Sequence, residues 1–171
     1  MTPTDVLRDE HRVILRALEL LERATAREPA DAWWADVVAW LRAFADRNHH
    51  AKEEAALFPA MVKAGVPSEN GPIAIMLEEH AEGRRLVATI GSATGGARAR
   101  AGRAYVALLR AHIDKENAIV FPLADAVLDA PADAALQREF EAVEVEQGVA
   151  ASIAAGDAAV DRLAAALEPG G

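Results

Sequence analysis

The chain has 171 residues, of which 52% are hydrophobic, and it carries a formal net charge of −9. This length and hydrophobic content fit one globular domain with a buried core, whereas the acidic charge and the short basic runs argue against nucleic acid or an anionic membrane surface as a partner. There is no cysteine, which excludes disulfides, thiolate catalysis and sulfur-ligated metal sites, so any metal must be held by nitrogen and oxygen.

Alanine supplies much of the apolar fraction and β-branched residues are sparse, so we expect an all-α fold. The first helix begins at Thr2 and Pro3, which suit the N-cap and the first helical position, with Asp5 at the capping-box position. Apolar residues recur at helical spacing up to about Arg27, which predicts that the helix ends there.

The second helix begins at Asp31 and passes through Pro59, where a kink or stop is expected because proline lacks the N–H that would bond to Ala55. One more turn follows, to about residue 64. A third helix opens at 70–72 and fades into the flexible segment 91–96.

The fourth helix begins near Ala97 and reaches Pro122. Beyond residues 129–131 the composition becomes rich in Ala and Glu, which predicts one or two further helices, interrupted near Gly148 or Gly156.

A sequence repeat links the second and fourth helices. HHAKEEAALFP, residues 49–59, aligns with HIDKENAIVFP, residues 112–122, at an offset of 63 and with six of eleven positions identical. The helix before each copy carries one histidine on its apolar stripe, in DEHR and in EEHA. The chain is therefore two helical hairpins in tandem.

Two such hairpins pack most easily as an antiparallel up-down four-helix bundle with a pseudo-two-fold axis. We expect this bundle to span residues 1–128. Residues 129–171 are expected to form a C-terminal helical extension that packs on the same domain or against a second subunit.

Residues four apart share a helix face, so each His-x-x-x-Glu directs an imidazole and a carboxylate to one point. Buried carboxylates need a counter-ion. The repeat therefore predicts two metal ions, each with two imidazoles, bridged by the two glutamates. The six candidate ligands are His11, His49, Glu53, His80, His112 and Glu116.

This donor set suits first-row transition metals, with iron the first choice for paired carboxylates in a helical bundle and manganese or a mixed centre as alternatives. Magnesium and calcium prefer all-oxygen shells.

Four nearby residues could also take part in the site. Because Ile113 stands at its counterpart, we interpret His50 as a solvent-side or indirect residue, although His50 with Glu54 is a competing ligand pair. Tyr105 is interpreted as a core residue, a hydrogen-bond donor near the metal or a phenolate ligand. Glu79 is interpreted as a surface carboxylate or ligand, and Met76 as apolar lining.

Four segments together resemble a bacterial hemerythrin-like (HHE cation-binding) domain in order and spacing: LRDEHRVILRAL, HHAKEEAALFP, EEHAEGR and HIDKENAIVFP. The resemblance covers roughly residues 5–125. It implies that the six candidate ligands hold an oxo- or hydroxo-bridged non-haem di-iron centre with a position open to dioxygen or nitric oxide.

Two departures from the family pattern bear on function. Met76 stands where the family places a second histidine, and the last motif is His-x-x-x-Glu where the oxygen carriers have His-x-x-x-x-Asp. Six protein ligands thus replace seven, which favours reactivity over reversible oxygen storage and a pattern closer to members linked to nitric-oxide stress.

The leading hypothesis is a protein that binds dioxygen or nitric oxide in sensing, storage or stress response. Two competing hypotheses are a di-iron peroxidase or oxidase acting on hydrogen peroxide, and a module in which metal only stabilises the bundle. A ferritin-like site would show Glu-x-x-His instead.

No apolar run approaches the roughly 18 residues of a membrane span, and MTPTDVLRDEH carries charges where a signal peptide is apolar. We expect a cytoplasmic monomer or homodimer.

Overall fold

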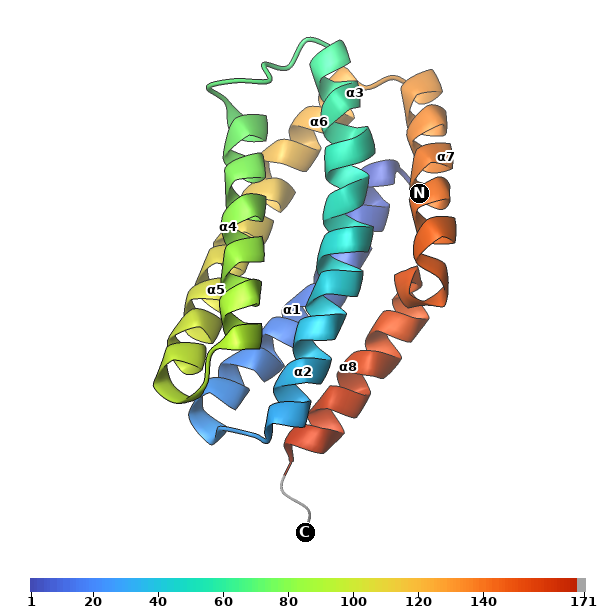
Figure 1. The fold of residues 1–171 in the computed structure, drawn as a ribbon. Coiled ribbons are helices and arrows are strands. Elements are labelled where there is room, and N and C mark those ends of the chain that lie inside the picture. The colour runs from blue at the N-terminus through green and yellow to red at the C-terminus, as the bar shows by residue number, and fades with distance from the viewer. Residues whose placement is uncertain (169–171) are drawn as a thin grey trace.

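The chain folds into helices alone over residues 1–168, the part that the computed structural model describes (Figure 1). The all-α prediction is confirmed. The elements are α1 Pro3–Arg27, α2 Asp31–Trp40, α3 Phe58–Lys63, α4 Pro72–Ser92, α5 Gly95–Lys115, α6 Phe121–Val127, α7 Ala130–Gln147 and α8 Ile153–Leu167, with π-helical segments η1 Leu41–His50, η2 Glu53–Leu57 and η3 Glu116–Val120 and the 3₁₀ turn η4 Gly148–Ala151.

The capping residues place the helix ends where the sequence predicts them. Thr2 Oγ1 accepts a hydrogen bond from the Asp5 amide at 3.2 Å, and the Asp5 carboxylate accepts one from the Thr2 amide at 2.8 Å. This reciprocal pair satisfies two amides at the start of α1. The helix ends where Glu28 adopts the left-handed conformation, with φ 48°.

Both copies of the repeat contain the same backbone irregularity. The amides of Phe58 and Phe121 bond to the carbonyls of Glu53 and Glu116, five residues earlier. A proline follows each phenylalanine, and its ring would clash with the carbonyl four residues before it in a regular helix. The wider π turn relieves this conflict, so the helix does not stop at Pro59 but continues to the end of α3.

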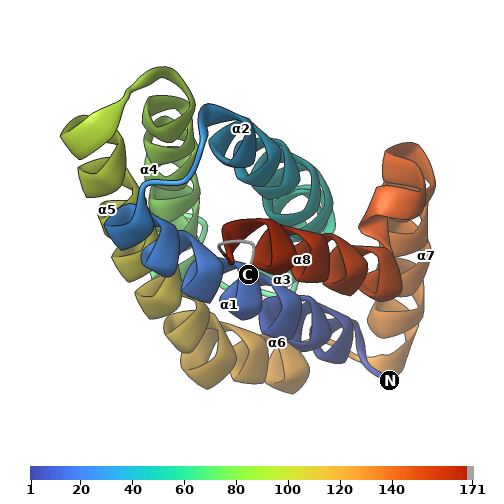
Figure 2. The same cartoon turned by 90° about the horizontal axis from the view of Figure 1, so that it is seen from below.

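Successive long helices run in alternating directions, and the chain from α2 to α3 forms one rod, as does the chain from α5 to α6 (Figure 1). Helix α4 packs beside α5, and α1 packs against both α5 and α8. From below, α8 is seen beside α1 and α2 (Figure 2). The last two helices therefore form an additional layer on one side of the bundle.

Two apolar clusters fill the interior, one towards each end of the rods. Val13 and Leu86 belong to the cluster that includes the tryptophans of α2. Leu7 and Met76 belong to the other, which includes Phe58 of α3. On α1 and α4 the change from one cluster to the other occurs around the histidines, so a polar layer separates two hydrophobic cores.

The C-terminal extension joins both cores. Leu136 and Phe140 of α7 enter one cluster, and Leu163 of α8 enters the other. The indole of Trp33 donates a buried 2.9 Å hydrogen bond to the Leu163 carbonyl. The chain interrupts its helix at Gly148, with φ 68°, whereas Gly156, the second predicted break point, lies inside α8.

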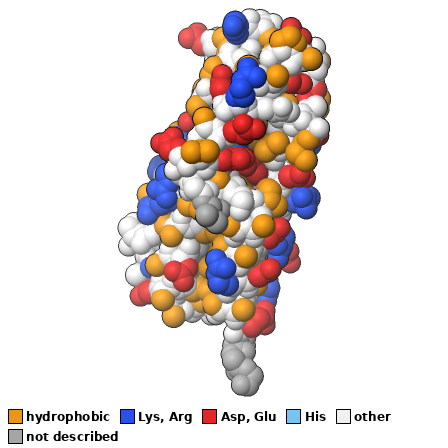
Figure 3. Space-filling model, turned by 90° about the vertical axis from the view of Figure 1, so that its right-hand side faces the viewer, with side chains coloured by type: hydrophobic (Ala, Val, Ile, Leu, Met, Phe, Trp, Pro, Cys, Tyr) orange, Lys and Arg blue, Asp and Glu red, His pale blue; other side chains and the backbone are white. Residues whose placement is uncertain are grey.

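The face formed by α7 and α8 mixes acidic, basic and apolar side chains without a large region of one sign (Figure 3). Within residues 1–168, no helix combines the length and the apolar content that a membrane crossing requires.

Candidate metal centre

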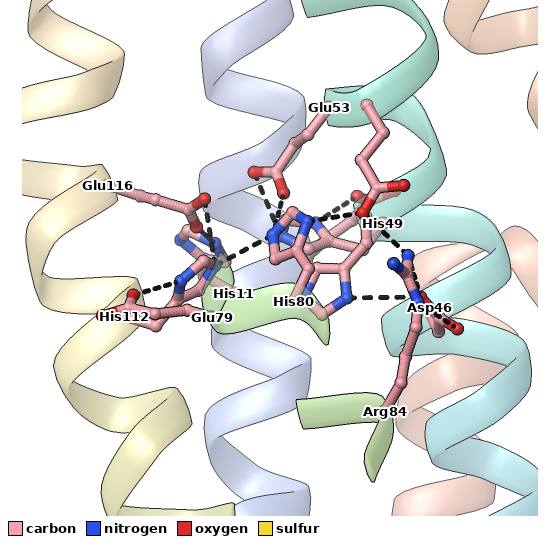
Figure 4. Close-up of polar contacts among 12 residues, drawn as sticks. His11, Asp46, His49, Glu53, Glu79, His80, Arg84, His112 and Glu116 are labelled. Carbon is pink, nitrogen blue, oxygen red and sulfur yellow. Dashed lines mark hydrogen bonds and ion pairs between the residues drawn. The ribbon is translucent and has the colours of Figure 1, made fainter. Parts of the chain in front are cut away.

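All five histidines of the chain are buried in the layer between the two cores. Figure 4 shows His11, His49, His80 and His112 converging with Glu53 and Glu116 from the rods of the bundle. The structure thus brings together the six residues that the sequence proposed as ligands, and it adds His50.

These side chains form two groups in which the candidate ligand atoms lie within 4.8 Å of one another. One group is His50, Glu53, His80 and His112, and the other is His11, His49, Glu53 and Glu116. Glu53 belongs to both. One group contains three imidazoles and the other contains two, whereas the sequence predicted two imidazoles for each metal ion.

The two carboxylates occupy equivalent places across the repeat. Glu53 has one oxygen 3.5 Å from His49 Nε2 and the other 3.3 Å from His80 Nε2. Glu116 has one oxygen 3.1 Å from His112 Nε2 and the other 3.1 Å from His11 Nε2. Each carboxylate therefore spans a histidine of its own helix and one of another helix, as a bridging ligand does.

Two histidines form hydrogen bonds through Nδ1 to carboxylates that lie outside the centre. His49 Nδ1 lies 2.8 Å from Glu10, and His112 Nδ1 lies 2.8 Å from Glu79. In the sequence, each of these glutamates immediately precedes the lone histidine of its half. An Nδ1–H that donates to a carboxylate leaves Nε2 as an acceptor facing inward, the tautomer that binds metal.

Lysines complete these two chains of contacts. Lys52 bonds to Glu10, and Lys115 bonds to Glu79. Both lysines come from the repeat, at the shared position before the glutamate. The repeat therefore encodes not only the candidate ligands but also their supports. Sequence reasoning missed this role, although the shared Lys and the Glu-His pairs carried the signal.

The remaining two imidazoles have equivalent partners as well. His80 Nδ1 lies 2.8 Å from Glu54, and His11 Nδ1 lies 3.0 Å from the Asn117 amide oxygen. Glu54 and Asn117 are related by the same offset of 63. Glu54 also accepts from Arg84, so it supports His80 from outside the groups and does not pair with His50.

The solvent-side interpretation of His50 is wrong. Its exposed fraction is 4%, and its ring stacks on that of His80 with 3.9 Å between centroids. The comparison of repeats missed it because Ile113 occupies its counterpart. The π-helical conformation of η1 holds more residues per turn, so His49 and His50 diverge less around the axis than neighbours in an α-helix.

Three further residues near the centre have defined environments. Glu79 is not a free surface carboxylate, because its side chain is 18% exposed and contacts His112. Met76 is buried in an apolar cluster, as expected. Burial, with a contribution from the Asp46 charge, raises the pKa of Tyr105, so its hydroxyl stays neutral. Tyr105 belongs to neither metal-candidate group.

The donor set fits a cation. Both oxygens of Glu53, one of Glu116 and His49 Nε2 are buried without a hydrogen-bond partner among the described residues. The Nε2 atoms of His80 and His112 face each other at 3.1 Å. Because the outer carboxylates take the Nδ1 protons, the centre consists of acceptors that face acceptors. A bound cation would make such an arrangement favourable.

For two of the histidines the pKa directions agree with this description, whereas the burial of His112 is outweighed by its contacts with Glu116, which raise its pKa. Burial lowers the pKa of His49 to about 4 against the opposing hydrogen bond to Glu10. Burial, and then the charge of His80, lowers the pKa of His50. Both imidazoles are therefore neutral, the form that coordinates metal.

The two central carboxylates shift in opposite directions. Burial and the charge of Glu116 raise the pKa of Glu53 well above its usual range. Burial opposes ionisation of Glu116 too, but its contacts with His11 and His112 outweigh that effect and hold its pKa low. A coordinated cation would favour the ionised form of Glu53 as well.

Comparison with protein families gives one match, in which residues 2–124 fit the model described as the hemerythrin HHE cation binding domain. Neither curated proteins nor solved structures give a significant match. The matched segment contains all seven residues of the two groups.

Proposed function

The chain belongs to the hemerythrin HHE cation-binding family, and on this premise we propose that it binds two transition-metal ions, most simply iron, and presents them to dioxygen or nitric oxide. The buried acceptors that face one another without donors carry this proposal. Imidazole with carboxylate suits iron, and manganese or a mixed pair is the second choice.

The proposed ligand set has seven members. His50, His80 and His112 would hold one ion, His11 and His49 would hold the other, and Glu53 and Glu116 would supply carboxylates to the pair. His50 supplies the imidazole that Met76 does not. With it, the number of protein donors equals the seven of the oxygen carriers that the family resemblance describes.

The supporting residues keep these donors in the required state. Glu10 and Glu79 hold protons on the Nδ1 atoms of His49 and His112 and so direct the Nε2 lone pairs inward. The apolar clusters on both sides exclude water from the layer. When bound, a ferrous pair would supply the electrons that reduce or bind a small diatomic ligand.

The proposed functional unit is an antiparallel four-helix bundle over residues 1–128, with residues 129–171 as an extension. The alternating rod directions and the convergence of candidate ligands from four rods support this division. Its role is in sensing, storage or the response to oxidative or nitrosative stress.

Metal analysis tests the ligand set. Protein loaded anaerobically with ferrous iron should contain two ions per chain, and Glu53→Gln should remove most of both. His50→Ala should weaken one ion selectively. Glu82→Gln, an exposed carboxylate paired with Arg85, is the matched control. Full loading of Glu53→Gln, measured by elemental analysis, would refute the proposed centre.

Optical spectroscopy tests the small ligand. Admission of dioxygen or nitric oxide to the ferrous protein should change its near-ultraviolet and visible absorption, and Glu82→Gln should behave as the parent protein does. An unchanged spectrum in a fully loaded sample would leave metal binding intact but rule out the ligand.

The enzyme hypothesis, turnover of hydrogen peroxide, rests on an open position at Met76. His50 removes that argument because it brings a fifth imidazole to the centre. Metal-dependent peroxide consumption that is lost in His112→Ala would restore the enzyme hypothesis.

A further inference from the structure

A cavity of about 330 Å³ lies between η1 and α4, on the side of the candidate centre where Arg84 and Asp46 are seen in Figure 4. Its size is at the small end of ligand-binding sites in proteins. Neither the candidate ligands other than His50 nor their supporting glutamates line it. The cavity therefore adjoins the metal-binding layer through His50 and is otherwise distinct from it.

The cavity carries a positive charge that the protein does not neutralise. Arg42, Arg47 and Arg84 line it, with Asp46 as the one carboxylate. Asp46 is used by Arg84, with contacts of 2.9 and 3.1 Å. Over residues 1–168, no ion pair involves Arg42 or Arg47. Both arginines are exposed, so their guanidinium groups are available to a ligand that enters the cavity.

The conformation of η1 places these two arginines together. They are five residues apart in η1, a little more than one turn of a π-helix, and both line the cavity. Guanidinium groups bind a carboxylate through charge-assisted hydrogen bonds.

Two unsatisfied polar groups line the inner part of the cavity. His50 is 4% exposed, and its Nδ1 has no hydrogen-bond partner among the described residues, with Asp46 at 3.5 Å. The hydroxyl of Tyr105 likewise makes no hydrogen bond in the described chain. A buried polar atom such as His50 Nδ1 is normally satisfied, so this nitrogen and the adjoining Tyr105 hydroxyl can both serve a ligand.

The remaining walls are apolar. Leu41 and Val87 line the cavity, and Gly83 leaves space beside Tyr105. A Cβ added at Gly83 would lie 3.6 Å from the Tyr105 ring, so the missing side chain opens this part of the wall. A flat or short hydrophobic body fits between these surfaces.

We propose that this cavity is a binding site for a small organic carboxylate. The carboxylate binds Arg42 and Arg47, the apolar body lies against Leu41 and Val87, and a polar group at the far end reaches His50 and Tyr105. The site shares His50 with the proposed metal centre, but its arginines and apolar walls come from the protein and need no metal.

Calorimetric titration with 4-hydroxybenzoate tests the proposal, with the metal content of each sample measured in parallel. The parent protein should bind this probe, and its neutral isostere 4-hydroxybenzamide should bind at least about tenfold more weakly. The double variant Arg42→Gln/Arg47→Gln should weaken 4-hydroxybenzoate about tenfold or more. Arg100→Gln/Arg103→Gln, which removes two exposed charges outside the cavity, should bind as the parent does.

Three results would overturn the site: absence of binding in folded protein, equal binding of acid and amide, or equal loss in both double variants. Binding that appears only with metal and survives Arg42→Gln/Arg47→Gln would also overturn it, because the carboxylate would then be a metal ligand. A sample without metal that still binds the probe through the arginines would support the cavity, independently of the outcome for the metal centre.

Discussion

Lys52 has a fully buried ammonium group that contacts Glu10, itself 2% exposed, and lies 2.7 Å from Glu144 of α7. Burial would favour the neutral form of Glu10, but its contacts with His49 and Lys52 keep its pKa low. Glu10 is thus ionised only because charged or donating neighbours surround it.

Lys52→Met should therefore lower the free energy of unfolding by about 3–5 kcal/mol, since it leaves a buried carboxylate without its cation. Urea unfolding measures the change. Lys115→Met is the matched control, because the repeat counterpart is 38% exposed and should cost about 1 kcal/mol or less. Equal losses in both variants would contradict the importance of burial.

Tyr105 is the single tyrosine of the chain, so its ionisation can be followed without interference from another. Burial, and then the negative charge of Asp46, raises its pKa above the ordinary value of 10.0. The folded state therefore keeps this proton when the unfolded state has lost it. Stability must fall as the pH rises above 10.

Phenolate absorbance should appear at higher pH in native protein than in urea-unfolded protein. The urea concentration at half-unfolding should be lower at about pH 11 than at about pH 8. Tyr105→Phe should show a smaller decrease over the same range, since it removes this titration. Coincident titration of the folded and unfolded samples would show that the phenol is accessible.

At the scale of elements, Gly156 permits the contact between α8 and η1. A Cβ at this position would lie 2.7 Å from Phe44 Cε2 and 3.1 Å from Cδ2. Phe44 is 1% exposed and stacks on Trp40, so its ring has little room to move.

Gly156→Ala should lower the free energy of unfolding by about 1–3 kcal/mol through overpacking, despite the better helix propensity of alanine. Thermal or urea unfolding tests it. Gly91→Ala serves as the control, because its Cβ would make an ordinary 3.6 Å contact with Val38, and this variant should be unchanged or more stable by up to about 1 kcal/mol. Stabilisation by both substitutions would argue against close packing of α8.

Helix positions could be predicted from the sequence wherever local chemistry decides them. Thr2, Pro3 and Asp5 set the start of α1 through their own hydrogen bonds, and Gly148 ends α7 through its positive φ. The π turns could not be predicted, because they resolve a conflict between Pro59 and the backbone that a kink could also have resolved.

The same limit applies to the candidate site. The repeat is sufficient to select His49 with Glu53 and His112 with Glu116, since both copies keep them. His50 has no copy, and its inward position depends on the π-helical geometry of η1. The assignment of the six residues as ligands stays a prediction, which the metal analysis above tests.

For the whole molecule, the two cores are joined through a layer of acceptors, so bound metal should contribute to global stability. Binding to the folded state alone adds about 4 kcal/mol when free metal exceeds the dissociation constant a thousandfold. Chelator treatment should lower the melting temperature of the parent protein, measured by calorimetry. Glu53→Gln should show little further decrease, whereas Glu82→Gln should respond as the parent does. A melting temperature that chelation leaves unchanged would contradict this coupling.

The extension formed by α7 and α8 covers the two halves of the repeat unequally. Lys52 lies sealed beneath Glu144, whereas its counterpart Lys115 is 38% exposed. The lysine that supports the site is therefore shielded from solvent in one hairpin and partly exposed to solvent in the other. Water molecules and protons should therefore reach the supports of His112 more readily than those of His49, so the two related sites need not load or react at the same rate.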